Sequence, residues 1–291
     1  MPKVSIIIPT HDRPQLLGKA LNSILKQSFG DYEVIVVDDG LKERAGSIVK
    51  ELDDDRIRYI AHDRERGGSA ARNMGIKNAS GRFLAFLDDD DEWLPQKLER
   101  QLGLLEGSDE DVGFCFSSVI RDYGDKEEKT YVKEGVADYA IVSLSRFKGF
   151  LTSTLLVKRE VFEEIGLFDE SLPSHQEAEL MIRMSKRFKG IGIDEPLVKM
   201  SCQAGHEHIG GNIDKKIAGR LLVLKKHEKE YEGRKDLLAK HYFWMALWLR
   251  DAGRIEEAID FLKKSLRYRF NLSYFFHLLY LKSDFKKWSR K

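Results

Sequence analysis

Short apolar runs alternate with amphipathic stretches over the first 95 residues of the chain. Four runs rich in β-branched and aromatic residues predict buried strands, at 4–8, 33–37, 57–60 and 82–87. Apolar side chains between these runs recur at helical spacing, over 14–25, 43–53 and 69–79. Because strands alternate with helices, we expect an α/β fold with a mostly parallel sheet and helices on both faces. Asp12 is expected to cap the first helix, with Pro14 in its first turn.

The pattern is looser in the middle of the chain. Helices are expected at 95–106, 158–165 and 177–188, strands at 112–120, 152–157 and 191–200, and a hairpin in the polar stretch 121–135. From residue 213 onward the spacing is helical, and residues 248–258 resemble the turn of a tetratricopeptide repeat. Only one such copy is present, so the pattern predicts a helical appendage and not a solenoid.

Composition narrows the class of protein. The chain has 291 residues, of which 42% are apolar, enough for one large domain or two modest ones. Its 49 basic and 48 acidic residues leave a net charge of +1, which argues against a nucleic-acid partner. Two cysteines far apart in sequence fit a reducing compartment. The apolar run near the N-terminus is too short for a signal peptide, and no run is long enough to span a membrane, so a cytoplasmic protein is expected.

The acidic run FLDDDDEW, residues 86–93, carries the first candidate chemistry. It follows a predicted core strand, and ligands of open α/β sheets bind beyond the carboxyl ends of strands. Carboxylates are suitable ligands for Mg²⁺, Mn²⁺ or Ca²⁺. Residues i and i+2 at a strand end point to the same side, so Asp88 and Asp90 should converge and Asp89 should point away. The alternative is an acidic turn whose charges, Asp89 and Glu92, lie at the N-terminus of a helix that holds Pro95 in its first turn.

Five segments together resemble a known family, namely 4–14, 34–40, 67–95, 152–170 and 177–184. In order and spacing they are similar to the inverting glycosyltransferases of family 2, which have the GT-A fold. The resemblance extends over residues 3–200. It implies a Rossmann-like sheet made of a nucleotide-sugar half, 1–110, and an acceptor half, 111–212, followed by a helical region at 213–291.

For the donor side, the resemblance implies a metal-dependent DxD motif at Asp88 and Asp90, with Mn²⁺ or Mg²⁺ as cofactor. Asp90 would be the direct ligand and Asp91 the runner-up, while Asp88 would contact the ribose or, through water, the metal. Asp39 would accept a hydrogen bond from the nucleobase, which suits a UDP-sugar ahead of GDP- or dTDP-sugars. The alternative, an Asx-turn, is favoured for Asp38. The remaining donor-binding residues implied are Pro9, Thr10, His11, Asp12, Arg13, Arg72, Asn73 and Asp89.

For the acceptor side, the resemblance implies a catalytic base at Glu177, where the family usually has Asp. Glu179 lies on the other side of the same predicted helix, so only one of the two can face the site. A turn at Phe168, Asp169 and Glu170 would contact the acceptor, a glycan or a lipid-linked glycan. His206 and His208 are further candidate metal ligands.

The tail, residues 261–291, mixes nine basic residues and nine aromatic residues with a single acid. That mixture suits peripheral contact with the inner face of an anionic membrane, or else a helix pair with a basic solvent face. Two other functions stay open. A sugar-nucleotide nucleotidyltransferase would carry a glycine-rich basic loop after the first strand, which residues 9–14 do not supply. A non-catalytic nucleotide-sugar binding module is allowed by the glutamate at 177.

Overall fold

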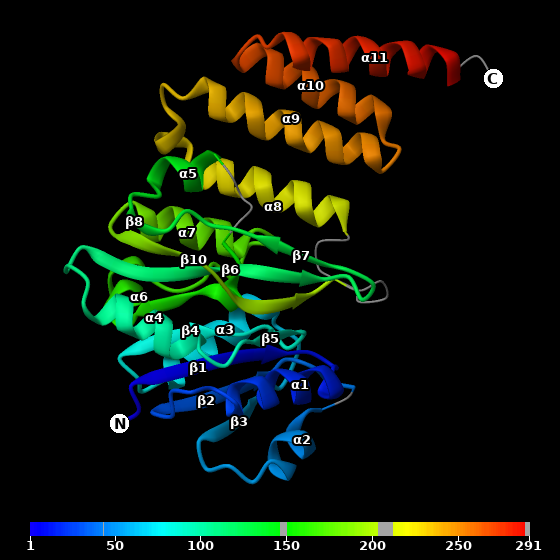
Figure 1. Ribbon diagram of the computed structural model, residues 1–291. Coiled ribbons are helices and arrows are strands. Elements are labelled where there is room, and N and C mark those ends of the chain that lie inside the picture. The colour runs from blue at the N-terminus through cyan, green and yellow to red at the C-terminus, as the bar shows by residue number, and fades with distance from the viewer. Residues whose placement is uncertain (43, 146–149, 203–211, 289–291) are drawn as a thin grey trace. The chain divides into compact units, whose positions relative to one another are not determined.

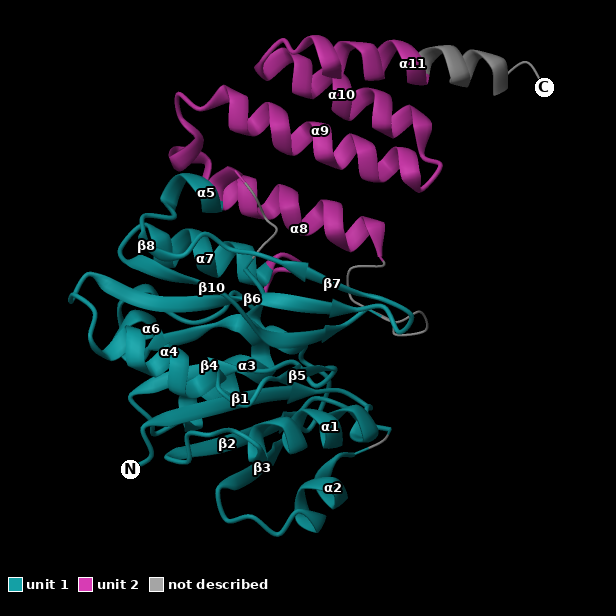
Figure 2. Ribbon diagram, viewed as in Figure 1, with its two compact units in different colours: residues 1–143, 148–170, 176–206 teal, residues 144–147, 171–175, 207–291 magenta. Residues whose placement is uncertain are grey.

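The computed structural model describes residues 1–42, 44–145, 150–202 and 212–288, with side chains as far as residue 281. The chain divides into two compact units, coloured separately in Figure 2. Unit 1 comprises 1–143, 148–170 and 176–206, and unit 2 comprises 144–147, 171–175 and 207–291. Unit 1 therefore draws on both of the halves expected on either side of residue 110.

Unit 1 is a mixed α/β structure built on one ten-stranded sheet (Figure 1). Its strands are β1 (Val4–Thr10), β2 (Tyr32–Asp38), β3 (Ile57–Ala61), β4 (Phe83–Phe86), β5 (Asp91–Trp93), β6 (Val112–Asp122), β7 (Glu127–Thr130), β8 (Gly135–Ala137), β9 (Leu156–Lys158) and β10 (Lys189–Ser201). Its helices are α1 (Pro14–Leu25), α2 (Gly46–Glu51), α3 (Gly68–Asn78), α4 (Lys97–Glu106), α6 (Arg159–Ile165), α7 (Gln176–Ser185) and the start of α5 (Ala140–Ser145), and it includes the 3-10 turn η1 (Thr152–Thr154).

The strand order is β3-β2-β1-β4-β9-β6-β10-β5, with β7 on β6 and β8 on β10. The first four strands of the order are mutually parallel, as the sequence predicts. β9 is antiparallel to both β4 and β6, which makes the sheet mixed. Since β1, β2 and β4 are parallel neighbours, the loops that follow Thr10, Asp38 and Phe86 leave the same edge of the sheet.

The two faces of the sheet have separate cores. Along β1, Ile6 and Ile8 pack with the apolar residues of α1 and α4, including Leu17 and Leu98. Ile7 points to the other face, where it packs with residues of α3, α6 and α7. This alternation is the period of two expected of a strand, and burial of both sets stabilises the sheet on which the loops are mounted.

The acidic run departs from the expected geometry. β4 ends at Phe86, so Asp88 to Asp90 lie in a turn and the alternation of a strand does not apply to them. Asp91 to Trp93 form β5, antiparallel to β10, because the buried Trp93 pairs with Val198 there. α4 begins only at Lys97. The expectations that Pro95 lies in the helix and that Asp89 and Glu92 are helix N-terminal charges are therefore wrong.

Two further local expectations are wrong. Asp12 does not cap α1, because its φ is 51° and its Oδ1 accepts a hydrogen bond from the Lys42 N–H across 2.9 Å. Arg13 occupies the cap position without a side-chain hydrogen bond. The stretch 152–157 is not one strand, since its first three residues form η1 and β9 starts at Leu156.

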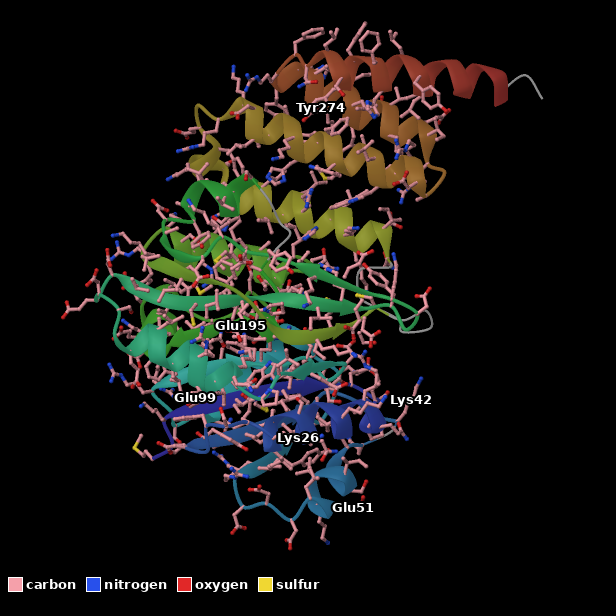
Figure 3. The ribbon with its side chains drawn as sticks, in the orientation of Figure 1. Lys26, Lys42, Glu51, Glu99, Glu195 and Tyr274 are labelled. Atoms are coloured by element: carbon pink, nitrogen blue, oxygen red, sulfur yellow. The ribbon has the colours of Figure 1, made fainter. Side chains whose placement is uncertain are left out.

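Unit 2 is helical in its described part, as the spacing beyond residue 213 predicts. Its elements are α8 (Ile213–Lys226), the 3-10 turn η3 (Glu228–Tyr231), α9 (Lys235–Asp251), α10 (Ile255–Tyr268) and α11 (Leu272–Trp288). α9 and α10 form the helical hairpin expected at 248–258, with Leu249 and Leu262 in their shared core. Tyr274 of α11, labelled in Figure 3, stacks on Phe243 of α9 with the ring centroids 3.8 Å apart. Among the helices described, none is long and apolar enough to cross a bilayer.

Candidate active site

Three loops meet at the carboxyl edge of β1, β2 and β4. The Asp39 N–H donates to the Thr10 carbonyl across 2.9 Å, which joins the loops after β2 and β1. The Thr10 hydroxyl donates to Asp89 Oδ2 across 2.7 Å, which joins the β1 loop to the acidic run. The structure therefore brings together the residues that the sequence assigns to donor binding.

Asp88 is held by a cation and a hydroxyl. Arg72 NH2 lies 2.5 Å from Asp88 Oδ1, and the Thr152 hydroxyl donates to Asp88 Oδ2 across 3.1 Å. Arg72 is 8% exposed and its guanidinium also lies 5.7 Å from the centre of the Phe168 ring. Although burial lowers the pKa of Arg72, the charges of Asp88 and Glu177 raise it, so this side chain is a fixed cation.

Asp89 and Asp90 share a second arginine. Arg13 NH2 lies 3.1 Å from Asp89 Oδ1, and Arg13 NH1 lies 3.1 Å from Asp90 Oδ2. Asp89 is buried, contrary to the expectation that it points away from the site. Burial raises the pKa of Asp89 to about 6, although the charge of Arg13 and the Thr10 hydroxyl work in the opposite direction.

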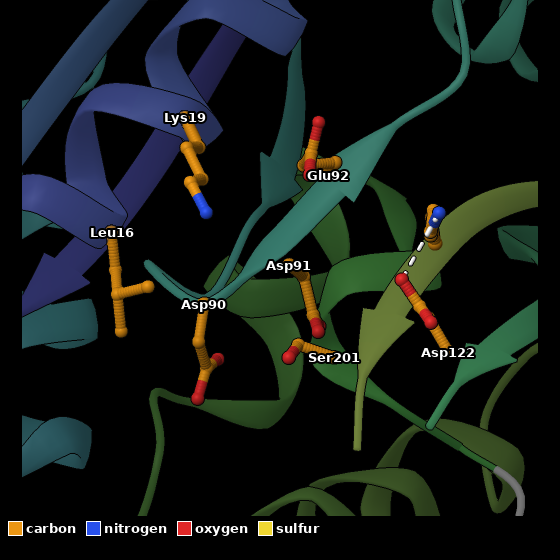
Figure 4. A pocket seen from close by; sticks show the side chains of 8 residues that line it. Leu16, Lys19, Asp90, Asp91, Glu92, Asp122 and Ser201 are labelled. Carbon is orange, nitrogen blue, oxygen red and sulfur yellow. Dashed lines mark ion pairs between the residues drawn. The ribbon is translucent and has the colours of Figure 1, made fainter. Parts of the chain in front are cut away.

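Asp91 is buried, like Asp89. The Ser153 hydroxyl donates to its Oδ2 across 2.6 Å, and the Ser201 N–H donates to it as well. Burial first, and the charge of Asp88 second, raise the pKa of Asp91 well above its usual range. Figure 4 shows Asp90, Asp91 and Ser201 around a cavity of about 70 Å³ within unit 1.

The negative charge of the acidic run suits a divalent cation, whereas the arrangement of its carboxylates in this structure suits one less well. Four adjacent carboxylates repel one another, and the pKa values of Asp89 and Asp91 are raised first by burial and then by the charges of neighbouring carboxylates. A cation would relieve this repulsion, so the donor set fits Mn²⁺ or Mg²⁺. The carboxylates do not form one ligand cluster in this structure, because Asp88 and Asp90 are paired with different arginines. Among the described residues, the one group of three His, Cys, Asp or Glu side chains whose ligand atoms all lie within 4.8 Å of one another is His11, Asp12 and Glu65.

Two adjacent aspartates at the end of β2, Asp38 and Asp39, have different hydrogen-bond partners. Asp38 accepts hydrogen bonds from the N–H groups of Gly40 and Ala45, which confirms the Asx-turn favoured for it. Asp39 Oδ1 accepts from His62 Nδ1 across 2.6 Å and from the Arg66 N–H across 2.8 Å. Asp39 Oδ2 accepts from the Gly67 N–H across 2.7 Å. A carboxylate oxygen has two lone pairs, so Oδ2 can accept one more donor, as an N–H of a nucleobase would require.

His11 and Pro9 are two further residues expected around the nucleobase. His11 is exposed, with Nδ1 4.0 Å from Asp39 Oδ2 and Nε2 3.7 Å from Glu65 Oε1. Pro9 lies within β1, opposite Val37 of β2. These contacts place His11 between the carboxylates of Asp39 and Glu65.

Asn73 contacts the turn after α6. Its Nδ2 donates to the Phe168 carbonyl and its Oδ1 accepts from the Phe168 N–H, both across 2.9 Å, and Nδ2 also lies 2.9 Å from Glu170 Oε1. The Phe168 ring is buried and packs on Phe86 with the centroids 5.6 Å apart. Asp169 is partly buried and Glu170 is exposed. Of the residues expected to contact the acceptor, Phe168 is thus the one that lies in the core.

Glu177 and Glu179 have different surroundings, as the helical spacing predicts. Glu179 is fully buried, and its carboxylate pairs with Arg183, whose NH2 lies 2.8 Å from Glu179 Oε2. Glu177, in the first turn of α7, is partly buried, and the charges of Arg72 and Asp88 both act on it. Burial raises the pKa of Glu177, while the charge of Arg72 lowers it. Glu177 is thus the acid of α7 that shares its surroundings with the donor-binding loops. His206 and His208 lie outside the described residues.

The sequence interpretation missed several side chains that shape this site. Thr152 and Ser153 contact Asp88 and Asp91, but the sequence pattern predicts a strand over 152–157 that includes both of them. His62 contacts Asp39 from a loop that shows no periodicity. The buried Lys97 lies on the apolar face of α4, and a lysine on such a face is the one signal that could have singled it out.

The architecture defines a class of protein. A mixed sheet with a carboxylate loop after β4, at the edge where β1 and β2 also end, is a GT-A fold. Residues 5–166 match Glycosyl transferase family 2, and the chain belongs to that family. Both expectations from the sequence, the fold and the family, are confirmed.

Two of the curated relatives are named for sugar transfer to undecaprenol-linked glycans. The chain is 38% identical over 102 residues to UDP-Glc:alpha-D-GlcNAc-diphosphoundecaprenol beta-1,3-glucosyltransferase WfgD of Escherichia coli, covering 35% of this chain and 40% of that protein. It is 36% identical over 150 residues to GalNAc(5)-diNAcBac-PP-undecaprenol beta-1,3-glucosyltransferase of Campylobacter jejuni, covering 50% and 48%. The chain thus spans less than half the length of either relative.

A relative matched over more of its length is the amylovoran biosynthesis glycosyltransferase AmsB of Erwinia amylovora, 31% identical over 223 residues, covering 72% of this chain and 73% of AmsB.

Among solved structures, S. aureus TarS 1-349 in complex with UDP-GlcNAc matches with a TM-score of 0.67 and 20% identity, covering 90% of this chain and 81% of that one. Mannosyltransferase PcManGT from Pyrobaculum calidifontis, in complex with GDP-Man and Mn2+, matches with a TM-score of 0.63 and 17% identity, covering 99% and 83%. At these identities the structural matches support the fold alone.

Proposed function

We propose that this chain is an inverting glycosyltransferase that moves a sugar from a UDP-sugar to a lipid-linked glycan. The observation that carries the proposal is that Arg72 is ion-paired with Asp88 of the carboxylate loop and also interacts electrostatically with the acid Glu177. A sugar transfer needs these functions side by side, namely stabilisation of a diphosphate leaving group and a base for the acceptor hydroxyl.

The carboxylate loop and Arg72 would hold the donor diphosphate. Asp90 is the proposed direct ligand of a Mn²⁺ or Mg²⁺ ion, with Asp91 and Asp88 next to it. When bound, such an ion supplies Lewis-acid neutralisation of the diphosphate charge. Arg72 would add charge-assisted hydrogen bonds to the same phosphates, because its guanidinium already lies against Asp88 of the carboxylate loop. UDP is favoured as the nucleotide because Asp39 Oδ2 keeps a lone pair for the N3–H of uracil.

Glu177 is the proposed base. Its carboxylate would accept the proton of the acceptor hydroxyl, whose oxygen forms the new bond to the anomeric carbon. The bond from that carbon to the β-phosphate oxygen breaks, and the nucleoside diphosphate leaves with the electron pair. A raised pKa makes Glu177 a stronger base than an exposed glutamate, which suits proton transfer near neutral pH.

The acceptor class follows from the relatives. Two of them are named for sugar transfer to diphosphoundecaprenol-linked glycans, and a lipid-linked glycan is accordingly the proposed acceptor here. Asp169 and Glu170 are the residues of the α6–α7 turn that can reach an acceptor hydroxyl, since both lie at least partly at the surface.

The test is donor turnover in Glu177 and Asp90 variants. The wild-type chain, given UDP-sugars, Mn²⁺ and a diphosphoundecaprenol-linked glycan, should release UDP and extend the glycan. Glu177→Gln and Asp90→Ala should each reduce turnover by roughly a thousandfold, whereas only Glu177→Gln should still bind donor. Arg100→Ala, which removes an exposed ion pair to Glu195, is the matched control.

Other outcomes of this test point elsewhere. Donor binding without turnover in wild type and Glu177→Gln alike would favour the binding module. Release of inorganic diphosphate from a nucleoside triphosphate and a sugar phosphate would favour the nucleotidyltransferase.

Contact with the membrane surface that carries such an acceptor is proposed for unit 2. α11 has two apolar faces, and one of them packs on α9 and α10 through Leu278 and Leu281. The opposite face is exposed at Leu272, Phe276, Leu279 and Tyr280, which recur at helical spacing. A helix that is apolar on both faces is normally covered on both. The basic residues of 261–291 suit an anionic lipid surface as that cover.

Vesicle binding tests this contact. The wild-type chain should co-sediment with vesicles rich in phosphatidylglycerol, and Phe276→Ser with Leu279→Ser should reduce the bound fraction at least fivefold at equal stability. Leu104→Ser, which removes a similarly exposed leucine from α4, is the control. Equal sedimentation of all three chains would contradict the proposal, and a dimer that dissociates in the double variant would assign the face to a second copy of the chain.

A further inference from the structure

We propose that the η1 hydroxyl pair, Thr152 and Ser153, positions the carboxylates of the acidic run for metal and donor binding. This inference rests on the proposed function, because it assigns a task to residues that support the proposed ligands. Neither residue would touch the donor, so both are positioning residues.

The hydroxyl pair makes three contacts with the acidic run. The Thr152 hydroxyl donates to Asp88 Oδ2 across 3.1 Å. The Ser153 hydroxyl donates to Asp91 Oδ2 across 2.6 Å and accepts from the Asp88 N–H across 3.1 Å. Ser153 therefore ties the backbone at one end of the run to the carboxylate at the other end. Both residues are 1% exposed, so no solvent competes for these hydrogen bonds.

The backbone of η1 is itself held by buried side chains. Trp93 Nε1 donates to the Ser153 carbonyl across 2.9 Å, and Gln101 Nε2 donates to the Thr154 carbonyl across 2.8 Å. The Gln101 amide is oriented in turn by Lys97, whose Nζ donates to Gln101 Oε1 across 2.5 Å. Lys97 Nζ also lies 4.1 Å from the centre of the Trp93 ring.

These contacts remove freedom that the acidic run would otherwise have. Asp88 and Asp90 lie in a turn, where no strand pairing fixes their direction. Besides its ion pair with Arg72, Asp88 makes two hydrogen bonds with η1, and its carbonyl accepts from the Asp91 N–H across 3.1 Å. A carboxylate whose rotamer is fixed in advance loses less entropy on binding a cation or a phosphate-bound cation.

The experiment compares hydroxyl deletions with shape-matched controls. Ser153→Ala and Thr152→Val should each raise the Mn²⁺ concentration for half-maximal UDP release by roughly tenfold, because each removes one or two hydrogen bonds to the run. Thr152→Ser, which keeps the hydroxyl, should restore the wild-type value. Thr154→Val is the matched control in the same turn, since its hydroxyl bonds only the Leu151 carbonyl.

A purely structural role predicts a different result. It would lower the unfolding temperature of all three deletion variants and move the Mn²⁺ requirement of Thr154→Val as much as that of Ser153→Ala, and that outcome would overturn the proposal. A readout independent of turnover is Mn²⁺ binding by electron paramagnetic resonance in the presence of UDP. Wild-type affinity in Ser153→Ala would also overturn it.

Failure of the proposed function looks different. If the wild-type chain neither turns over nor binds UDP with Mn²⁺, the enzyme proposal fails, and a crystal structure of Ser153→Ala decides the positioning role. Displaced carboxylates of Asp88 and Asp91 would support it, and unmoved ones would refute it.

Discussion

Arg72 NH2 lies 2.5 Å from Asp88 Oδ1, and the same guanidinium has its pKa raised by the charge of Glu177. One buried cation thus interacts with an acid of the β4 loop and an acid of α7, which are far apart in the sequence. This relationship couples the proposed donor site to the proposed base.

Arg72→Gln should lower kcat/KM by roughly a hundredfold, because it removes a charge-assisted contact to the leaving group. It should also shift the pH profile. Glu177 acts ionised, so activity rises with pH through its pKa, and the charge of Arg72 lowers that pKa. Without the charge, the acidic limb should move to higher pH. Arg72→Lys should keep the limb in place, and an unmoved limb in Arg72→Gln would contradict the coupling.

Asn73→Asp should destabilise the protein by about 2–3 kcal/mol, because the buried Phe168 carbonyl loses its donor and a new charge lies next to Glu170. The free energy of unfolding from urea titration measures this loss. Asn22→Asp, at an exposed position of α1, should cost no more than about 0.5 kcal/mol. Similar losses for both variants would show that the contacts of Asn73 carry no special weight.

His62→Ala should raise the KM for the UDP-sugar roughly tenfold and leave kcat within about twofold, since it frees Asp39, a binding group remote from the reacting bond. Steady-state kinetics with varied donor separate the two constants. Tyr59→Phe is the control, because Tyr59 makes the equivalent hydrogen bond to Asp38, which only shapes the turn. A change in KM for Tyr59→Phe of the same size would assign the effect to the loop as a whole.

Lys97 makes stability depend on pH. Burial lowers its pKa from 10.5 to about 7, so between these values the unfolded chain binds more protons and stability rises with pH. Lys97→Met removes this dependence. Its stability advantage over wild type should shrink by about 2 kcal/mol from pH 7.5 to 9, at 1.36 kcal/mol per unit. Urea unfolding of both chains at several pH values measures this difference in the free energy of unfolding. The titration of Cys115 occurs in both chains and therefore cancels in the difference. A constant difference would mean that Lys97 stays protonated in the folded protein over this pH range, as it does in the unfolded chain.

Much of the fold follows from local pattern. The β-branched runs and the helical spacing predict β1 to β4 and the helices between them, because a buried strand and an amphipathic helix leave different periods in the sequence. The mixed second half is harder to predict. β9 and β5 are three residues each, too short to show a period, and tertiary pairing alone defines them.

The sequence by itself determined which groups are available, since the aspartates at 88–91, the acid at 177 and the arginines at 13 and 72 can be identified from their order and spacing. Only the tertiary structure decided how they divide. Arg13 pairs with Asp89 and Asp90, Arg72 pairs with Asp88, and Ser153 contacts Asp91. Partners so distant along the chain meet because β1 and β4 are parallel neighbours that end at one edge of the sheet, and η1 leads into β9, which pairs antiparallel with β4. Hydrogen bonds and charges act over a few ångströms of space, and the spacing of residues in a sequence does not fix those distances.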